Sequence, residues 1–405
     1  MLNFIQKQKD SSIKNYNIMN VLFYIPRYPG YGGIENVTTV LANWLIDKVN
    51  SITIYSFDNQ DKNLLLKNLS PKIEFIEAQC HQNYTDLSNI NQLRDIIFRK
   101  KIDRIIYQDS YAPIEDCLIR SIQGIPDIKL YIVEHNSPLC FLKLLKYKRI
   151  DSFYHKWKTK IFYPLYYLKI FNQIKKRHRL LYSICNKYIL LSDNFRKEFY
   201  HLVPEAQKNQ KIQSITNPIT ITKTNNPFTQ KEKICLFCGR LVSQKGIQYL
   251  IKIWKLVENK NKSWKLIIVG DGPEREFIED SIQKYGLKRI EMVGYKDIVQ
   301  PYYEKASILC MTSTFEGFGL VLVESMLFGC IPILFNSFAS ASDIIKSGKN
   351  GFLIPPFHVK EYTNKLLNLM ESPELIKEIS NNAIHSLEKF KLDSVGEQWI
   401  NLLNE

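Results

Sequence analysis

The feature that most constrains the fold is one unit of the chain, residues 306–335, in which two apolar runs enclose a glycine-bearing loop and a further apolar stretch. Ile308–Met311 and Ile331–Phe335 are continuously apolar, as is typical of buried parallel strands. The loop, residues 312–318, is small and polar. Leu320–Phe328 carries a single charge before a glycine, the residue type that often ends a helix. The unit therefore predicts strand, glycine loop, helix and strand, which is a piece of a parallel α/β sheet.

Two carboxylates, Glu316 and Glu324, lie in this unit with seven residues between them. Glu316 is predicted at the C-terminal edge of the first strand, where open α/β sheets bind ligands. Glu324 is predicted about one and a half turns into the helix. Between them, the first free helix amides, those of Phe318, Gly319 and Leu320, favour an anion. This order of hydroxyl acceptor, phosphate site and hydroxyl acceptor spans roughly the length of a nucleotide sugar at a helix rise of ~1.5 Å per residue.

The two carboxylates differ in how well an ordinary surface position explains them. A solvated loop position accounts for Glu316 about equally well. Glu324 is harder to explain in this way, because the helix around it is almost wholly apolar and a carboxylate within such a run needs a polar partner. A bound ribose would provide that partner.

Alternating apolar runs and helical patterns continue along the whole chain of 405 residues, a length that suggests two or three domains. In the first half, strands are expected near residues 21–25, 51–55, 73–76, 103–107, 129–133 and 187–191, and helices near 37–48, 86–100, 113–122 and 193–202. In the second half, strands are expected at 234–238, 266–269 and 290–293, a helix is expected up to residue 258, and residues 357–405 are expected to be helical. This alternation predicts parallel sheets covered by helices on both faces.

Two further glycine loops follow expected strands. Pro29–Glu35 includes Gly33, but it lacks the G-x-G-x-x-G pattern and a well-placed acidic residue further on, which disfavours a dinucleotide site. In the loop Gly239–Gly246, Arg240 and Lys245 are placed to reach phosphate oxygens, the arginine in a bidentate manner. A tight turn in the first loop and two ordinary surface cations in the second are the alternatives.

Residues 141–180 depart from the α/β rhythm. From Lys143 to Arg179 the chain has twelve basic residues and one acid, a net +11 out of +15 for the whole chain, with aromatic residues interleaved. This pattern is typical of an interfacial membrane surface. A solvated charged face or a nucleic-acid patch is the alternative, and no nucleic-acid motif accompanies the segment.

Cysteine and acid patterns give no indication of a metal or another cofactor. The eight cysteines lie mostly in apolar runs, as buried free thiols do in a reducing compartment. Cys235 and Cys238 form a C-x-x-C, but no second ligand pair follows at zinc-site spacing, and the two side chains of a strand at this spacing point to opposite faces. The sequence also lacks an Asp-x-Asp, and we expect no metal site.

The N-terminus and the longest apolar runs bear on location. The sequence contains no run of 18 uninterrupted apolar residues, so it predicts no transmembrane helix. The polar start of the chain lacks the apolar core of a signal peptide. We therefore expect a cytoplasmic protein, peripheral on the inner face of the cytoplasmic membrane through residues 141–180. Residues 1–18 are expected to be a loose extension.

The run Glu-Gly-Phe-Gly-Leu-Val-Leu-Val-Glu-Ser-Met at 316–326 resembles the Glu-x7-Glu motif of retaining glycosyltransferases of the GT-B fold, particularly family 4, the glycosyl transferases group 1. Other parts of the family pattern recur in order: a Gly-Gly-x-Glu at 32–35, a His-Asn at 135–136, an Asn-Pro at 217–218 and a Gly-Arg-Leu-x4-Gly at 239–246. The resemblance runs from about residue 20 to the end of the chain; it is strongest in 234–356 and weakest in 141–180.

The resemblance implies roles for individual residues. Arg240 and Lys245 would bind the diphosphate of the donor, with the backbone of residues 317–320 at the start of the helix. Glu316 would orient the transferred sugar, and Glu324 the ribose. The resemblance also implies that Gly33 borders the diphosphate and acceptor and that His135 lies beside the donor sugar or acceptor. It implies that Tyr295 and Lys296 lie near the nucleobase.

The same resemblance implies two doubly wound parallel-sheet domains that face each other across a cleft. We expect an acceptor-side domain over 19–216, a linker over 217–232, a nucleotide-sugar domain over 233–390 and a final helix, 391–405, that returns to the first domain. The implied reaction retains the anomeric configuration. It moves a hexosyl or N-acetylhexosaminyl group, by default from a UDP-sugar, to a saccharide, expected to be lipid-linked, in bacterial surface-polysaccharide assembly. A same-fold transferase or synthase with a soluble acceptor and a non-catalytic nucleotide-sugar-binding protein are the alternatives.

Overall fold

The computed structural model describes residues 19–59, 68–109, 111–151, 158–223 and 231–405. The expected N-terminal extension, 1–18, and part of the expected linker, 224–230, lie outside these residues. The chain forms two compact units, Met1–Tyr131 with Gly396–Glu405, and Ile132–Val395. This division lies elsewhere than the linker expected at 217–232.

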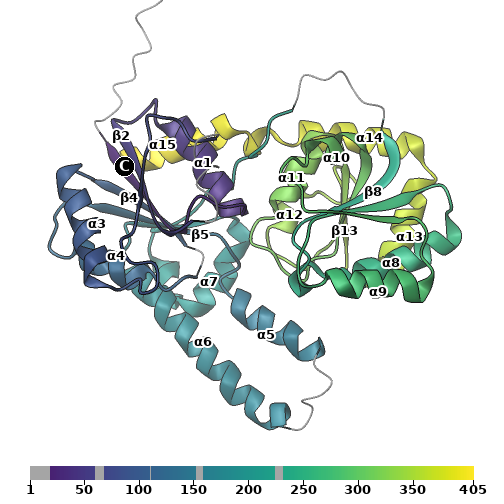
Figure 1. Ribbon diagram of the computed structural model, residues 1–405, viewed down its shortest axis with the longest axis horizontal. Coiled ribbons are helices and arrows are strands. Elements are labelled where there is room, and N and C mark those ends of the chain that lie inside the picture. Colours follow the sequence, from purple (N-terminus) through teal and green to yellow (C-terminus); the bar gives the residue numbers. More distant parts are fainter. Residues whose placement is uncertain (1–18, 60–67, 110, 152–157, 224–230) are drawn as a thin grey trace, which may run out of the picture. The chain divides into compact units, whose positions relative to one another are not determined.

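The first half of the chain builds a seven-stranded sheet in the order β3-β2-β1-β4-β5-β6-β7 (Figure 1). Its strands are β1 (Asn20–Arg27), β2 (Ser51–Asp58), β3 (Glu74–Glu77), β4 (Arg104–Asp109), β5 (Lys129–Glu134), β6 (Lys187–Leu190) and β7 (Ile212–Ser214). Its helices are α1 (Gly33–Leu45), α3 (Leu87–Arg99), α4 (Glu115–Ile122), α5 (Cys140–Asp151), α6 (Lys158–Ile184) and α7 (Arg196–Leu202). The described pairings are parallel, as β1 with β2 and with β4, so the predicted strands and helices of this half are confirmed. The short β7 was not predicted.

The final helix, α15 (Leu392–Asn404), packs in the first unit, where Figure 1 shows it in yellow beside α1. A Cβ added at Gly396 would lie 2.4 Å from the ring of Trp44, so glycine lets the helix approach α1 closely. Near its end, Leu403 accepts a hydrogen bond of 3.0 Å from Arg104 Nε. Leu402 accepts one of 3.4 Å from the hydroxyl of Tyr131.

The second sheet has six parallel strands in the order β10-β9-β8-β11-β12-β13. They are β8 (Glu232–Cys238), β9 (Lys265–Val269), β10 (Ile290–Gly294), β11 (Ala306–Met311), β12 (Ile331–Phe335) and β13 (Phe352–Ile354). The helices are α8 (Ile247–Lys260), α9 (Arg275–Tyr285), α10 (Gln300–Lys305), α11 (Leu320–Leu327), α12 (Ala341–Ile344), α13 (Val359–Met370) and α14 (Pro373–His385). The unit 306–335 is therefore β11, loop, α11 and β12, which confirms the predicted order.

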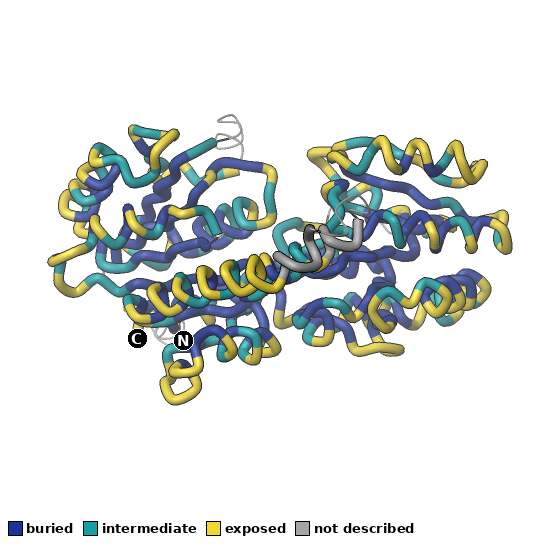
Figure 2. Tube along the Cα trace, turned by 90° about the horizontal axis from the view of Figure 1, so that it is seen from below, coloured by how far each residue is buried: buried dark blue, intermediate teal, exposed yellow. Residues whose placement is uncertain are grey.

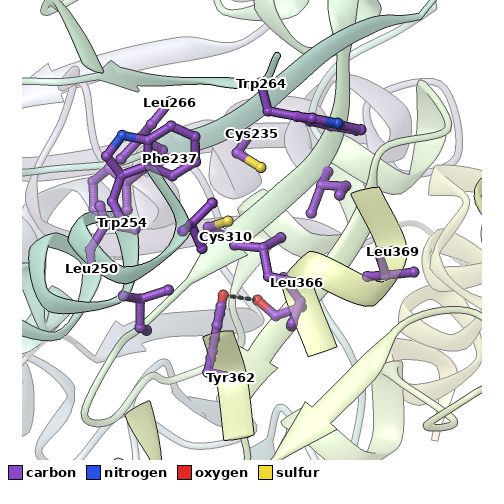
Figure 3. Close-up of a cluster of buried hydrophobic side chains, with 14 of the residues drawn as sticks. Cys235, Phe237, Leu250, Trp254, Trp264, Leu266, Cys310, Tyr362, Leu366 and Leu369 are labelled. Carbon is purple, nitrogen blue, oxygen red and sulfur yellow. Dashed lines mark hydrogen bonds between the residues drawn. The ribbon is translucent and has the colours of Figure 1, made fainter. Parts of the chain in front are cut away.

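The core of this sheet explains one of the two C-x-x-C cysteines. Cys235 is fully buried within an apolar cluster, drawn in Figure 3, that includes Trp254, Cys310 and Tyr362. The hydroxyl of Tyr362 donates to the carbonyl of Ile333 at 2.6 Å, which satisfies its one buried polar group. All eight cysteines are free thiols. No group of three or more metal-ligating side chains is found in the part of the chain that the structure describes.

The basic segment forms α5 and α6. Apolar side chains are unusually exposed on the described part of α6: Leu165 is 67% exposed, Tyr166 50% and Leu168 53%. Figure 2 shows this stretch in yellow, in contrast to the buried strands. Among the described residues, no helix has the length and apolar character needed to span a bilayer.

Candidate functional site

The loop that follows β11 is joined to the loop that follows β8, because these neighbouring parallel strands end at the same edge of the sheet. The amide of Thr314 donates to the carbonyl of Gln244 at 2.8 Å. The side chain of Gln244 donates back to the carbonyl of Phe315 at 3.1 Å. The hydroxyl of Thr312 donates to the carbonyl of Lys245 at 3.0 Å. The two loops are thus held as one structure.

Gly246 allows this close approach. Its φ is +65°, and an added Cβ would lie 2.0 Å from the carbonyl oxygen of Thr312. A side chain here would meet both a left-handed backbone and a rigid neighbour. The glycine therefore fixes the short turn (Ser243–Lys245) from which Lys245 projects.

The two joined loops bring Lys245 and Glu316 together. Lys245 Nζ lies 2.6 Å from Glu316 Oε1, and the two side chains are only 19% and 9% exposed. A carboxylate this deeply buried is stabilised by an opposite charge in contact with it. The pair places one positive and one negative group at the strand edge where α/β sheets bind ligands.

Helix α11 begins beside this pair. Gly319 caps it in the left-handed conformation, with φ +88°, and Leu320 is its first residue. The amide of Leu322 donates to the carbonyl of Gly319 at 2.9 Å, whereas the amides before it precede any possible acceptor within the helix. The hydroxyl of Ser340 donates to the carbonyl of Gly317 at 2.9 Å, which holds the loop just before the helix. The helix therefore begins at the position that the sequence predicted, and anion binding by its first amides stays a prediction.

His135 contacts the same loop. An added Cβ at Gly317 would lie 2.0 Å from the carbonyl oxygen of His135, so the two backbones are in direct contact. His135 itself is 6% exposed. The structure thus brings together His135, Gly317, Glu316 and Lys245, all within the second unit.

The residue before His135 belongs to a buried polar cluster that sequence reasoning missed. Glu134 Oε2 accepts a hydrogen bond of 2.7 Å from the hydroxyl of Tyr188 and lies 3.0 Å from Nε2 of His178. The other ring nitrogen of His178 lies 2.8 Å from the carbonyl of Ile174. Glu134 and His178 are both fully buried, which fixes the end of β5 against α6.

Glu324 is buried on α11, and the chain itself supplies the partners that the sequence analysis sought in a ribose. Its Oε1 accepts a hydrogen bond of 2.6 Å from Thr220, and its Oε2 one of 3.4 Å from Tyr303. Burial raises the pKa of Glu324, and the two hydroxyl donors oppose that shift. Neither partner was predicted, because Thr220 lies 104 residues away and no local pattern marks it.

Arg240 and the loop after β10 lie on the same edge of the sheet. The strand ends are held in line, since Gly239 donates to Val269 at 3.0 Å and Gly270 donates to Gly294 at 2.9 Å. Arg240 is exposed, and within the described residues its guanidinium makes no hydrogen bond or ion pair, so it is available to a ligand. Tyr295, 52% exposed, and Lys296 follow β10 on the surface.

Gly33 belongs to the first unit, unlike the other predicted site residues. It is the exposed first residue of α1. The carboxylate of Glu35 folds back over Gly32, where an added Cβ would lie 2.2 Å from Oε2. Burial raises the pKa of Glu35. The Gly-Gly-x-Glu sequence therefore places an acid at the start of this helix.

Two Rossmann-like parallel sheets place the chain in the GT-B class of α/β proteins. Residues 219–386 match the family described as Glycosyl transferases group 1. Among solved structures, Anabaena HepE in complex with UDP and glucose has a TM-score of 0.71 at 19% identity, with 95% of this chain and 99% of that chain covered.

Two curated relatives are similar over part of their length. An uncharacterised glycosyltransferase of Haemophilus influenzae is 30% identical over 225 residues, which cover 55% of this chain and 63% of that protein. The Campylobacter jejuni GalNAc-alpha-(1->4)-GalNAc-alpha-(1->3)-diNAcBac-PP-undecaprenol alpha-1,4-N-acetyl-D-galactosaminyltransferase is 27% identical over 230 residues, 56% of this chain and 62% of that protein. The chain thus spans less than two thirds of either relative.

Proposed function

We propose that this protein is a retaining, metal-independent glycosyltransferase that moves a hexosyl or N-acetylhexosaminyl group from a nucleotide-diphospho sugar to a hydroxyl of a saccharide. The observation that carries the proposal is the Lys245–Glu316 pair at the start of α11, with the buried Glu324 further along the same helix. A cation, an open helix start and two carboxylates in this order suit a diphosphate between two sugars.

Each group has a chemical task in this proposal. When the bond between the anomeric carbon and the diphosphate oxygen breaks, negative charge develops on the leaving diphosphate. Lys245, Arg240 and the amides at 318–320 stabilise that charge. Glu316 orients the transferred sugar, and Glu324 accepts hydrogen bonds from the ribose.

Retention is proposed without a covalent intermediate, since none of the described residues is evident as a double-displacement nucleophile. The acceptor oxygen bonds to the anomeric carbon on the face that the diphosphate leaves, and its proton passes to an oxygen of the leaving phosphate. His135 would lie beside the reacting sugar or acceptor, with Gly33 on the acceptor side. Tyr295 and Lys296 would flank the nucleobase.

UDP-sugars are the favoured donors, which is supported by the UDP and glucose bound to HepE. A lipid-linked acceptor in bacterial surface-glycan assembly is supported by the Campylobacter relative, whose name specifies a saccharide on PP-undecaprenol. We propose that α6 meets the cytoplasmic face of the membrane. Its exposed Leu165, Tyr166 and Leu168 suit the acyl boundary, and the basic residues of the same helix suit anionic headgroups.

The donor proposal is tested by a thermal-shift panel of UDP, ADP, GDP and CDP with their sugars, followed by product analysis with the sugar that binds. A binder raises the melting temperature by mass action. The anomeric configuration of the product is read from the NMR coupling between the anomeric carbon and its proton. Transfer that leaves this configuration unchanged from the donor supports the proposed retaining reaction. Binding of a nucleotide sugar without transfer or hydrolysis would instead favour the non-catalytic alternative.

The membrane proposal is tested by cosedimentation with vesicles of anionic phospholipid at low salt. Lys169→Gln with Lys176→Gln removes two exposed cations from one side of α6. Lys346→Gln with Lys349→Gln removes two exposed cations elsewhere in the second unit and serves as the matched control. Each headgroup cation contributes about 1 kcal/mol, so the first pair should weaken binding roughly thirtyfold. Equal binding by both variants would contradict the proposal and favour a soluble acceptor.

A further inference from the structure

The carboxylate of Glu324 is held by a hydroxyl on each of its oxygens. Thr220 donates to Oε1 at 2.6 Å, and Tyr303 donates to Oε2 at 3.4 Å. A carboxylate oxygen can accept two hydrogen bonds, so each oxygen keeps one acceptor site after these contacts. Glu324 as a whole residue is 8% exposed. Two neighbouring acceptor sites are the complement of two neighbouring hydroxyls.

The two donors are held differently. Tyr303 is fully buried within α10, so its hydroxyl has little freedom. Thr220 is partly exposed, and the backbone before it is fixed by a hydrogen bond of 2.8 Å from the amide of Ile219 to the carbonyl of Phe390. The ring of Phe390 packs against Phe318 with centroids 5.7 Å apart. One residue therefore braces both the segment that carries Thr220 and the loop that begins α11.

The short contact to Thr220 has a consequence for the charge of Glu324. Burial favours the neutral acid, and the hydroxyl donors favour the anion. Only the anion accepts hydrogen bonds through both oxygens, because the protonated acid uses one oxygen as a donor. Loss of the Thr220 hydroxyl would both free the carboxylate to rotate and weaken its anionic form.

We propose that Thr220 is a positioning residue that presents the Glu324 carboxylate to the vicinal hydroxyls of the donor's ribose. The inference rests on the proposed function and adds to it a second residue that determines affinity for ribonucleotides. The opposite role is that Thr220 occupies the place of a ribose hydroxyl and must leave when the donor binds. The two roles predict opposite changes in UDP affinity when the Thr220 hydroxyl is removed. A hydroxyl that occupies the ribose position opposes binding, so its loss tightens binding, whereas the loss of a positioning hydroxyl weakens it.

The experiment measures dissociation constants of UDP and 2′-deoxy-UDP by calorimetry for the wild-type protein and five variants. Thr220→Val removes only the hydroxyl, and Thr220→Ser keeps it. Thr222→Val is the matched control, since Thr222 is exposed two residues further along the same segment. Glu324→Gln is measured both alone and combined with Thr220→Val.

We expect Thr220→Val to weaken UDP binding about tenfold, the loss of one hydrogen bond to a charged group, and Thr220→Ser to bind like the wild type. The loss should shrink for 2′-deoxy-UDP and disappear on the Glu324→Gln background, which a general structural defect would not do. Unchanged or tighter UDP binding by Thr220→Val, or an equal loss for both nucleotides, would overturn the inference. If the wild type binds none of UDP, ADP, GDP and CDP, the proposed function fails first and the inference fails with it.

Discussion

Replacement of Lys245 by methionine should damage stability and turnover through two separable effects. Methionine keeps much of the volume of the side chain but removes the ammonium group 2.6 Å from Glu316. Removal of one partner from a buried pair leaves an uncompensated charge and costs about 3–5 kcal/mol. Since Lys245 is 19% exposed, water can reach the site, and we expect a loss of about 3 kcal/mol in the free energy of unfolding, at the lower end of this range. Thermal unfolding should report it as a lower melting temperature.

The second variant separates stability from catalysis. Lys245→Met combined with Glu316→Gln removes both charges, so the stability lost in the single variant should return for the most part. Turnover should not return, because one preorganised charge on a developing anion contributes about 3 kcal/mol, a factor of about 10² in rate. Transfer is measured at saturating donor on the folded fraction of each protein.

Two results would refute this reasoning. If Lys245→Met has the same melting temperature as the wild type, the buried charge of Glu316 is not stabilised by Lys245. If the double variant regains wild-type turnover, the ion pair serves the fold alone, and the diphosphate is not stabilised by Lys245.

Three further predictions follow from contacts on these loops and helices. Burial raises the pKa of Glu324, so the free energy of unfolding falls as the pH rises from the ordinary pKa of a glutamate to this raised pKa. Glu324→Gln should therefore be more stable than the wild type at pH 8, and the difference in stability should disappear in acid. Melting temperatures measured against pH check this. Gly246→Ala should place a Cβ 2.0 Å from the carbonyl of Thr312, cost about 1–3 kcal/mol and reduce transfer; an unchanged melting temperature would contradict the tight joining of the two loops. Gly396→Ala should strike the ring of Trp44 at 2.4 Å and cost about 1–3 kcal/mol, with protease cleavage of α15 as the readout; wild-type resistance would count against close packing of that helix.

Much of the fold could be predicted from the sequence, because each element carries its own pattern. The run Ile331–Phe335 is continuously apolar, and it is β12 with the same bounds. Helix α11 was predicted from the apolar run Leu320–Phe328 and the glycine that follows it, and the structure has it at Leu320–Leu327. β7 was missed because three residues with one buried side chain give no periodicity to detect.

The partners within the site could not be predicted in the same way. The sequence indicated Lys245 and Glu316 separately as ligand contacts, but their ion pair joins residues 71 positions apart. Thr220 and Tyr303 carry no motif, and only the folded sheet brings them to Glu324. Local patterns specify which residues reach a strand edge, whereas the hydrogen bonds among them depend on tertiary distances that no spacing encodes.

The pairing of Lys245 with Glu316 has a consequence for how the proposed donor would bind. Without a donor, the charge of each is compensated by the other at 2.6 Å. A diphosphate beside Lys245 would bring further negative charge close to the buried Glu316, which like-charge repulsion disfavours. Glu316 would then have to find new hydrogen-bond donors, and the hydroxyls of the transferred sugar are suitable ones. The diphosphate and the sugar should therefore bind cooperatively: UDP alone should gain less affinity from Lys245 than a UDP-sugar does. Equal losses of affinity for UDP and for the UDP-sugar in Lys245→Met would exclude this coupling.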